Sequence, residues 1–370
     1  MEFTNQILID MEEKQQKSKN YGSYYYFWSQ DMTLLNSEKE RLNRKSERIY
    51  NCLNLWEWDK YTNNKVLDLQ RVNRCMNNRF CPNCKKMDVT KSIIHFSPIF
   101  ENLIKEGYKP YLITLTVPNC KGEDLSSTID KMNKSFRKFN HLYSLSLLDK
   151  KSYGNRSIEF NGCLKVLEIT YNNQTKMYHP HFHILAFSYD KYKEELFNKN
   201  IKGLWSNKKN QQIYNSKLDI EIAKLWTMCF RTIRLTEKNF DNLSCRMGKN
   251  ENEIFICDIR EMDEFGIYEV LKYTFKDSDI SNLRVFKTLN IALNRKRIRQ
   301  GYGILYNIQL EDLEIGEVQD LELKTEEIPE HMTTRDINTL YIEYKDFKKI
   351  SRFNKSNYKE VLEKVQEFNV

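Results

Sequence analysis

The stretch Cys163-Leu-Lys-Val-Leu-Glu-Ile-Thr-Tyr171 is followed, after Asn172-Asn173, by His179-Pro-His-Phe-His-Ile-Leu-Ala-Phe187. Two apolar runs that are rich in strand-forming residues and separated by turn-forming asparagines predict a β-hairpin. Side chains alternate between the two faces of a strand, so the three histidines of the second run share one face. The hairpin therefore presents a row of imidazoles on a strand whose other face is apolar.

Strands and helices intermingle around this hairpin instead of alternating regularly. Upstream of it, Tyr111-Leu-Ile-Thr-Leu-Thr-Val117 is apolar on both faces, which predicts a buried strand. We therefore expect an α+β fold with an antiparallel central sheet. The apolar spacing also predicts helices over 125–139, 218–230 and 268–275, and a strand over 254–259.

Four segments differ in composition along the chain. Residues 1–48 form a polar and basic arm that we expect to be helical or partly mobile, and residues 49–105 form a small cysteine-rich module that ends in a helical pattern from Met87 to Ile104. We expect the central domain over 106–310. Residues 311–370 begin with an acidic segment and continue into a tail that we expect to be helical, with a helix over 358–368.

The net charge of +8 over 370 residues favours a polyanionic partner without requiring one. The first residues, Met1-Glu-Phe-Thr-Asn-Gln, do not resemble a signal peptide, and no span has the roughly 18 apolar residues that a transmembrane helix needs. We therefore expect a cytoplasmic protein without a membrane partner. Its nine cysteines are not expected to form disulfides in that reducing compartment.

Four of the cysteines are candidates for a structural zinc site. Cys75, Cys81 and Cys84 lie close together and include a CxxC pair, and Cys52 lies upstream. Four thiolates in a tetrahedral arrangement are a common structural site for Zn²⁺. Because Cys52 is distant in sequence, His95 is an alternative fourth ligand. The other interpretation is a set of buried free cysteines.

A second metal site is predicted on the hairpin. Glu168 lies between two apolar residues, where a carboxylate needs a partner to offset its desolvation. A metal ion bound by His181 and His183 on the adjacent strand would be that partner. Two histidines and one carboxylate leave coordination positions open, as a catalytic divalent ion such as Mn²⁺ or Mg²⁺ requires. His179, on the same face, is an alternative ligand.

The predicted helix over 268–275 carries a further pair of candidate residues. Glu269 and Tyr273 are four residues apart and so share a face, with Lys272 and Lys276 beside the tyrosine. A tyrosine can act as a covalent nucleophile and a carboxylate as a general base. The chain has 22 tyrosines, so this pattern alone is more typical of a core or surface residue.

Taken together, these motifs resemble those of the HUH endonucleases, and within them the rolling-circle plasmid replication initiators of low-GC Gram-positive bacteria. The order and spacing of the motifs make the resemblance specific, and it covers roughly residues 50–305. The matching stretches are Ile113-Thr-Leu-Thr-Val-Pro118, Glu168 with His179-Pro-His-Phe-His-Ile-Leu185, Glu269-Val-Leu-Lys-Tyr-Thr-Phe-Lys276, Arg71-Val-Asn-Arg-Cys75, Arg79-Phe-Cys-Pro-Asn-Cys84 and Leu293 to Gly303.

The resemblance implies both a fold and residue roles. It implies an antiparallel sheet with helices on one side, the metal-binding histidines on a central strand and the tyrosine on a helix that faces them. His181 and His183 match the paired histidines of the family. Tyr273 matches the nucleophile and Glu269 the carboxylate that activates water. Tyr268, on the same predicted helix, is a rival nucleophile.

The implied reaction is origin-specific nicking of one DNA strand without ATP. Tyr273 would form a 5′-phosphotyrosine and release a 3′-OH that primes synthesis, and water activated by Glu269 would act in termination. The expected partners are the double-stranded origin and single-stranded DNA of a plasmid, with a host helicase and polymerase; a homodimer is left open. The side chains expected to contact DNA phosphates are Lys272, Lys276, Arg295, Lys296, Arg297 and Arg299.

Two other interpretations remain open. A relaxase or transposase of the same superfamily would share this chemistry but recognise different DNA, and the cysteine segment and Glu269 favour the replication initiator over it. A non-enzymatic, zinc-dependent DNA-binding regulator would bind DNA without cutting it. Nicking of a supercoiled plasmid in the presence of Mn²⁺ or Mg²⁺ separates an enzyme from such a regulator.

Overall fold

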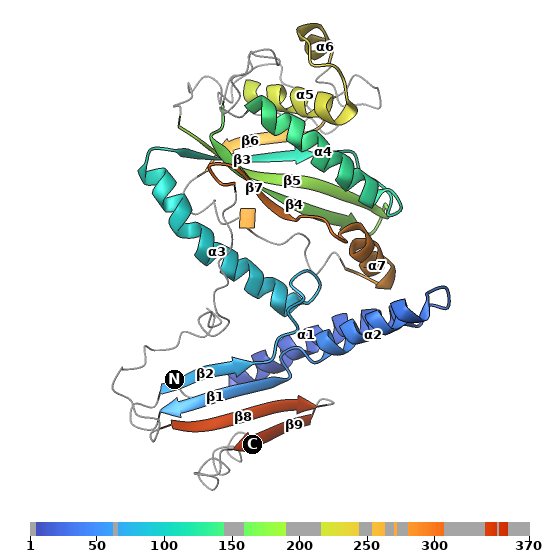
Figure 1. The fold of residues 1–370 in the computed structure, drawn as a ribbon, viewed down its shortest axis with the longest axis vertical. Coiled ribbons are helices and arrows are strands. Elements are labelled where there is room, and N and C mark those ends of the chain that lie inside the picture. The colour runs from blue at the N-terminus through green and yellow to red at the C-terminus, as the bar shows by residue number, and fades with distance from the viewer. Residues whose placement is uncertain are drawn as a thin grey trace. The chain divides into compact units, whose positions relative to one another are not determined.

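The chain divides into two compact units in the computed structural model, one made of Met1–Ser92 with Glu311–Val370 and the other of Ile93–Leu310 (Figure 1). Helix α3 (Pro82–Lys105) spans the boundary between them. Among the described residues, no helix is both long enough and apolar enough to cross a membrane. The structure describes residues 5–61, 66–143, 159–189, 216–243, 254–262, 270–271, 280–306, 337–345 and 348–353.

Two helices, α1 (Asn5–Ser29) and α2 (Asn36–Tyr50), pack along one another in the first unit. They approach closely at Gly22, where a Cβ atom would lie 2.8 Å from the backbone nitrogen of Tyr50. Ser46 Oγ donates a hydrogen bond of 2.8 Å to the carbonyl oxygen of Gly22. The segment expected to be a polar arm is therefore a helical hairpin with a buried seam.

The first unit also contains a four-stranded antiparallel sheet in the order β2-β1-β8-β9. The expectation of a helical C-terminal region is wrong for its described residues, because β8 and β9 are strands. Their strand-forming side chains, and the backbone pairing of Trp56 with Ile342, explain the difference. The predicted helix over 358–368 lies outside the described residues. The strands are β1 (Leu55–Tyr61), β2 (Val66–Val72), β8 (Ile337–Lys345) and β9 (Lys348–Phe353).

The second unit is built on a five-stranded antiparallel sheet in the order β6-β3-β5-β4-β7, so that β5 is central. The antiparallel sheet, the hairpin and the strand before it are confirmed. The strand expected from residue 254 begins instead at Cys257. The strands are β3 (Lys109–Thr116), β4 (Gly162–Asn172), β5 (Met177–Ser188), β6 (Cys257–Glu261) and β7 (Arg299–Gly303).

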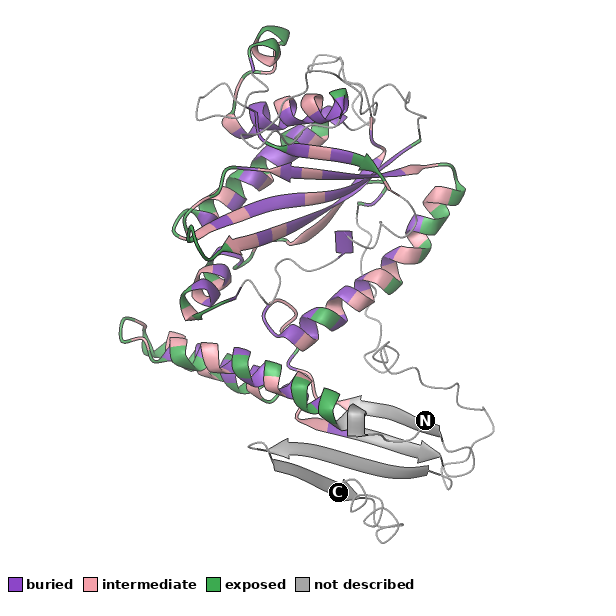
Figure 2. Cartoon of the chain, turned by 180° about the vertical axis from the view of Figure 1, so that it is seen from behind, coloured by how far each residue is buried: buried purple, intermediate pink, exposed green. Residues whose placement is uncertain are grey.

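One face of this sheet is covered by α4 (Leu125–Tyr143) and α5 (Lys217–Arg231) (Figure 1). Both helices were predicted from their apolar spacing. Phe182 of β5 is fully buried there, with its ring centroid 5.6 Å from that of Phe136 and 6.2 Å from that of Trp226. Figure 2 shows the buried residues concentrated on the inner sides of these two helices and along the sheet. This contact forms the main apolar core of the unit.

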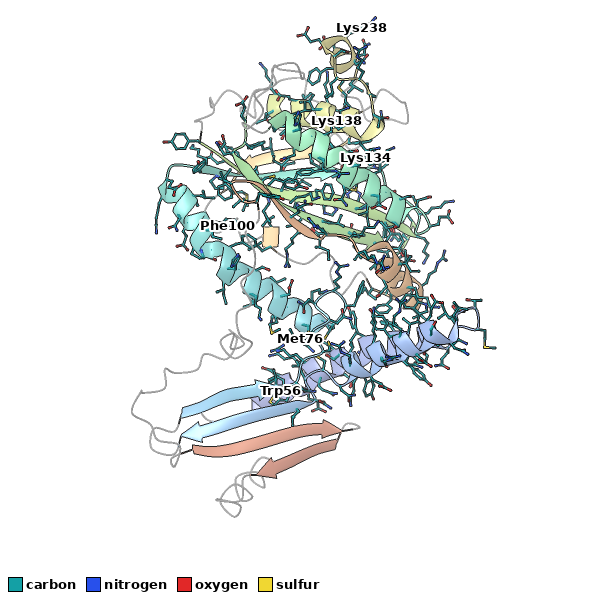
Figure 3. The ribbon with its side chains drawn as sticks, viewed as in Figure 1. Trp56, Met76, Phe100, Lys134, Lys138 and Lys238 are labelled. Atoms are coloured by element: carbon teal, nitrogen blue, oxygen red, sulfur yellow. The ribbon has the colours of Figure 1, made fainter. Side chains whose placement is uncertain are left out.

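The opposite face is covered by the part of α3 that belongs to the second unit. Phe100 of α3 is labelled in Figure 3, and its ring centroid lies 5.4 Å from that of Phe187. The expectation of helices on one side is therefore wrong. The reason is that the second face is apolar too at this end of the sheet, and its buried residues need a cover of their own; they are Leu112, Leu164, Val166, Leu185 and Phe187.

The helix predicted from Met87 begins earlier, at Pro82, because proline suits the first turn of a helix, where its missing N–H costs nothing. Of the helix predicted over 268–275, only Val270 and Leu271 are among the described residues. The remaining described helices are α6 (Glu237–Asp241) and α7 (Leu283–Ala292).

Candidate metal centre

The hairpin brings Glu168, His181 and His183 together on one face of the sheet. Glu168 of β4 pairs directly with His181 of β5, and His183 is two residues further along the same strand. The Oε2 atom of Glu168 lies 2.8 Å from Nε2 of His183 and 3.4 Å from Nε2 of His181. One ligand atom from each residue lies within 4.8 Å of the others, so the three side chains can share one metal ion.

The second nitrogen of each imidazole is held by a neighbour. Nδ1 of His181 lies 3.1 Å from the carbonyl oxygen of His179, to which it can only donate. Nδ1 of His183 lies 3.3 Å from Oγ1 of Thr114 on β3. These contacts turn both Nε2 atoms toward Glu168. An acceptor that takes a hydrogen bond from the far N–H is the usual way in which proteins orient a metal-binding imidazole.

Glu168 is ionised in this environment. Burial raises the pKa of its carboxyl group, but the hydrogen bonds to His181 and His183 outweigh that effect and hold the pKa at about 2. A carboxylate and two nitrogens that converge in a partly buried position are donors suited to a divalent cation. The side chains also leave the site partly open, since His183 and Glu168 are only half-buried.

His179 is oriented differently from the other two histidines. Its Nδ1 atom lies 2.8 Å from Oδ1 of Asn119, and its ring is stacked on that of His181 with centroids 5.1 Å apart. Burial and the neighbouring His181 lower the pKa of His179, which favours a neutral ring. The three side chains that the structure brings together are thus those of Glu168, His181 and His183, with His179 beside them.

The apolar side chains on the same face of the sheet pack against Val270 and Leu271, which belong to the segment that contains the candidate nucleophile Tyr273. Val270 and Leu271 are buried in one cluster with Val166 and Leu185, which are on the same strand faces as the metal-binding group. The pairing of Val166 with His183 shows how closely the cluster adjoins the group. The candidate residues Tyr268, Glu269, Lys272, Tyr273 and Lys276 lie outside the described residues.

The other predicted basic residues lie in the turn after α7 and at the start of β7. Arg295 and Arg297 are exposed, and Arg295 has a left-handed backbone conformation with φ of 56°. Lys296 forms an ion pair with Asp130 of α4, so its charge is partly neutralised. Arg299 is half-buried on β7. Arg295 and Arg297 are therefore the two of these side chains that are open to solvent.

The four cysteines of the first unit also converge. Sγ of Cys52 lies 3.6 Å from that of Cys81 and 3.7 Å from that of Cys84, and Sγ of Cys75 lies 3.6 Å from that of Cys84. A tetrahedral Zn²⁺ with Zn–S bonds of about 2.3 Å would place its sulfurs about 3.8 Å apart. The spacing fits that geometry. Cys52, and not His95, is the fourth member of the group.

All four of these cysteines are buried, and they are free thiols. Hydrogen bonding with Cys52, Cys75 and Cys84 lowers the pKa of the Cys81 thiol. Hydrogen bonding within the same cluster, together with burial, raises the pKa of Cys52. Four buried thiols that converge in this way can exchange their protons for a metal ion.

Thr114 and Asn119 are site residues that the sequence interpretation did not single out. Thr114 belongs to the strand that pairs with β5 and lies directly opposite His183. The alternation of Thr114 and Thr116 in an otherwise apolar strand was the available signal, because polar residues at every second position face one side. Nothing in the sequence near Asn119 indicated its contact with His179.

Comparison with known proteins gives a consistent result. A family model described as "Replication protein" matches residues 66–353. A "Protein rep" of Bacillus sp is 27% identical over 296 residues, which cover 76% of this chain and 84% of that protein. A "Protein rep" of Bacillus amyloliquefaciens is 27% identical over 301 residues, covering 77% and 79%. One of Streptococcus pneumoniae is 26% identical over 256 residues, covering 66% and 65%. No solved structure matches the chain.

Proposed function

Because the chain belongs to the replication-protein family, we propose that it initiates rolling-circle replication of a plasmid by nicking one strand of the origin DNA with a tyrosine. DNA is the partner that membership of this family implies. The nick, its covalent intermediate and the residues that produce them are the parts of the proposal that need support from the site itself.

The observation that carries the proposal is the convergence of Glu168, His181 and His183 on one sheet face. The donors fit a divalent ion, because one charged carboxylate oxygen and two imidazole nitrogens already point at one another. Bound there, Mn²⁺ or Mg²⁺ would polarise a phosphodiester and stabilise the charge that develops on it. Three protein ligands leave room for oxygens of the DNA.

Tyr273 is the proposed nucleophile. The burial of Val270 and Leu271 against the face that holds the metal-binding group supports this assignment, since Tyr273 follows Leu271 by two residues. Its phenolic oxygen attacks the phosphorus as the hydroxyl proton is lost, and the bond from phosphorus to the 3′-oxygen breaks. The products are a 5′-phosphotyrosine and a 3′-oxygen, which takes up a proton to become the 3′-OH primer for a host polymerase.

Glu269 is the proposed general base of termination. Glu269 lies directly before the buried pair Val270 and Leu271, and Tyr273 lies two residues after that pair. Glu269 and Tyr273 are therefore four residues apart in sequence. In the terminating cleavage, Glu269 accepts a proton from water as the water oxygen attacks phosphorus in place of a second tyrosine, and the bond from phosphorus to the 3′-oxygen breaks. This division of roles lets the enzyme end a round of replication without a second covalent adduct.

We further propose that Cys52, Cys75, Cys81 and Cys84 bind a structural zinc ion. Their sulfur–sulfur distances of 3.6–3.7 Å and their complete burial support this. Arg295 and Arg297, which are exposed in the second unit, remain candidates for contacts to DNA phosphates.

A nicking assay tests the proposed function. Supercoiled plasmid that carries the origin is incubated with the full chain and Mn²⁺, and covalent protein–DNA adducts are detected after denaturation. The Tyr273→Phe variant should form neither open circles nor adduct, whereas Tyr268→Phe, the matched control on the same segment, should form both.

Two results would count against the proposal in different ways. Adduct on Tyr268 in the Tyr273→Phe protein would move the nucleophile and leave the reaction class intact. Binding of origin DNA without any nick by the wild-type chain would favour a DNA-binding regulator instead. Cleavage at a conjugative transfer origin or a transposon end, and not at a replication origin, would indicate a relaxase or a transposase.

A further inference from the structure

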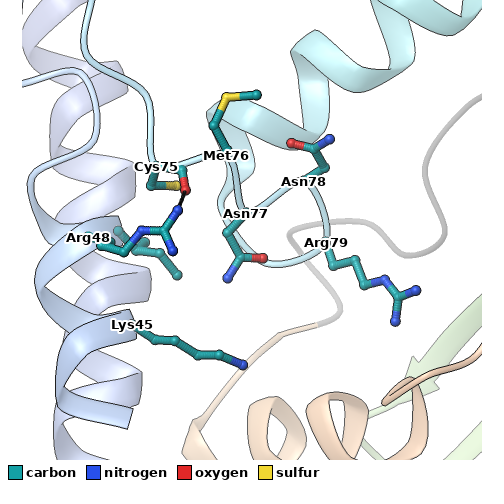
Figure 4. Close-up of a pocket in the computed structure, with 8 residues that line it drawn as sticks. Lys45, Arg48, Cys75, Met76, Asn77, Asn78 and Arg79 are labelled. Atoms are coloured by element: carbon teal, nitrogen blue, oxygen red, sulfur yellow. Dashed lines mark hydrogen bonds between the residues drawn. The ribbon is translucent and has the colours of Figure 1, made fainter. Parts of the chain in front are cut away.

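The first unit contains a cavity of about 400 Å³ between α2 and the loop that joins β2 to α3 (Figure 4). Lys45 and Arg48 line it from α2. The loop contributes Met76, Asn77 and Arg79. In Figure 4 the side chains of Lys45 and Asn77 extend toward the same space, and Arg79 borders it. No aspartate or glutamate is among the lining residues, so the cavity has a net positive wall.

The cations from α2 are available to a ligand. Among the described residues, neither Lys45 nor Arg48 forms an ion pair. One guanidinium nitrogen of Arg48 donates a hydrogen bond of 2.8 Å to the carbonyl oxygen of Cys75, which leaves its other N–H groups. The Lys45 ammonium lies 5.7 Å from the ring centroid of Tyr25. Burial and the charge of Arg41 lower the pKa of Lys45.

The loop wall of the cavity is preformed. Cys75 and Cys81, at its two ends, both belong to the sulfur cluster. Between them, Oδ1 of Asn77 accepts a hydrogen bond from the backbone N–H of Phe80 at 3.2 Å, and the carbonyl oxygen of Asn77 accepts one from Cys81 at 3.0 Å. Met76 is held in the left-handed region with φ of 56°. A ligand would therefore meet a shaped site without having to order it.

We propose that this cavity binds the phosphodiester backbone of duplex DNA. The inference rests on the proposed function only in that DNA is the substrate. Three cations suit a phosphate, and the planar guanidinium groups of Arg48 and Arg79 match its oxygens in pairs. The volume suits a nucleotide unit better than a lone ion, and the apolar side chains of Met76 and Ile49 offer a wall for the sugar. The first unit would then hold DNA by its backbone while the second unit performs the cleavage.

The test compares two double variants of the full chain. Lys45→Gln with Arg79→Gln removes two cations from the cavity. Lys17→Gln with Arg44→Gln is the control. It removes one lysine and one arginine that are exposed on the same helical hairpin but do not line the cavity. Arg44 does pair with Glu40 at 3.4 Å, but both side chains are exposed, so the loss of that pair has little effect. Zinc content and circular dichroism report whether each variant is folded.

The measured quantity is the salt dependence of binding to a short fluorescein-labelled DNA duplex, followed by fluorescence anisotropy. Each phosphate contact contributes about 0.9 to the slope of log affinity against log salt concentration. The cavity variant should lose about 1 to 2 from this slope, and the control should keep the wild-type slope. Equal slopes for the wild type and the cavity variant, or equal losses in the two variants, would overturn the proposal.

A second measurement separates this inference from the proposed function. Adduct formation on a single-stranded oligonucleotide that carries the nick site depends on the second unit, and the cavity variant should form adduct at the wild-type rate on saturating oligonucleotide. If no protein forms adduct while the cavity variant alone loses duplex affinity, the nicking mechanism is wrong and the DNA-binding site stands. If adduct forms but the salt slopes are equal, the site is wrong and the mechanism stands.

Discussion

Leu271 should control the rate of nicking through its anchoring of the segment that contains Tyr273. The Leu271 side chain is completely buried in the apolar cluster on the metal-binding face. Replacement by alanine removes three carbon atoms, which at about 0.8 kcal/mol each corresponds to about 2.4 kcal/mol of transfer free energy. The cavity left behind raises the total to about 3 kcal/mol.

Part of the free energy lost in Leu271→Ala should appear as easier local detachment of residues 270–271 from the sheet. In the described residues, the segment is held by Val270 and Leu271, so Leu271→Ala removes three of the seven side-chain carbon atoms of this apolar anchor. A weaker anchor increases the population in which the segment has left the sheet, and about 1.4 kcal/mol of local free energy corresponds to a tenfold change in that population. We expect adduct formation under single-turnover conditions to slow by about tenfold or more.

The matched control is Leu305→Ala. Leu305 belongs to the same cluster and is 1% exposed, so its replacement creates a comparable cavity, but it lies after β7 and away from residues 270–271 in sequence. Urea denaturation should show similar losses of unfolding free energy for the two variants. If adduct forms equally fast in both, the burial of Leu271 serves stability alone, and the argument that it positions Tyr273 is refuted.

Four further outcomes are expected. His183→Ala should abolish nicking and weaken Mn²⁺ binding measured by calorimetry, while duplex binding persists; a variant that nicks at the wild-type rate would exclude His183 as a ligand. Glu269→Ala should form the first adduct normally but carry out the water-dependent terminating cleavage ~10²-fold more slowly, so that adduct and multimeric displaced strands accumulate on gels; normal termination would contradict its role. Cys84→Ser should release about one zinc ion per chain, measured with a chromogenic chelator, and destabilise the first unit; wild-type protein purified without thiol-bound zinc would leave the cysteines as core residues. Burial lowers the pKa of Lys165 from 10.5 to about 8, so between these pH values the unfolded chain holds a proton that the folded chain has released, and stability should rise with pH in this window. Lys165→Met should remove that rise in denaturation midpoints, and an unchanged pH dependence would show that Lys165 does not titrate in this way.

The hairpin of the second unit could be predicted because its information is local. Alternation in Val166, Glu168, His181 and His183 determines which side chains share a face, and the intervening asparagines indicate the turn. The pairing of Glu168 with His181 depends in addition on the length of the turn between Asn172 and Met177, which the asparagines alone do not determine. Which nitrogen of His183 faces inward does not follow, since it depends on Thr114 of a strand more than fifty residues upstream.

The sheet of the first unit could not be predicted in the same way. The segment from Cys52 to Cys84 was interpreted by its metal-binding cysteines and its lack of helical spacing, and the strands β1 and β2 within it were overlooked. β8 pairs with β1 across more than 270 residues of intervening chain, and no local pattern identifies a partner so remote. The tail that follows the acidic segment was expected to be helical, and the pairing of β8 with β1 makes it a strand over Ile337–Lys345 instead.

The position of β8 between β1 and β9 has a consequence for synthesis on the ribosome. β1 emerges early with only one of its neighbours, β2, and its other edge has unpaired backbone groups until residues 337–345 are made. All of Ile93–Leu310 is translated in that interval. An unpaired edge is prone to intermolecular pairing, so the nascent chain is most exposed to aggregation before its last strands leave the exit tunnel. A premature stop codon after residue 310 would therefore leave the second unit whole and the first unit permanently open at β1.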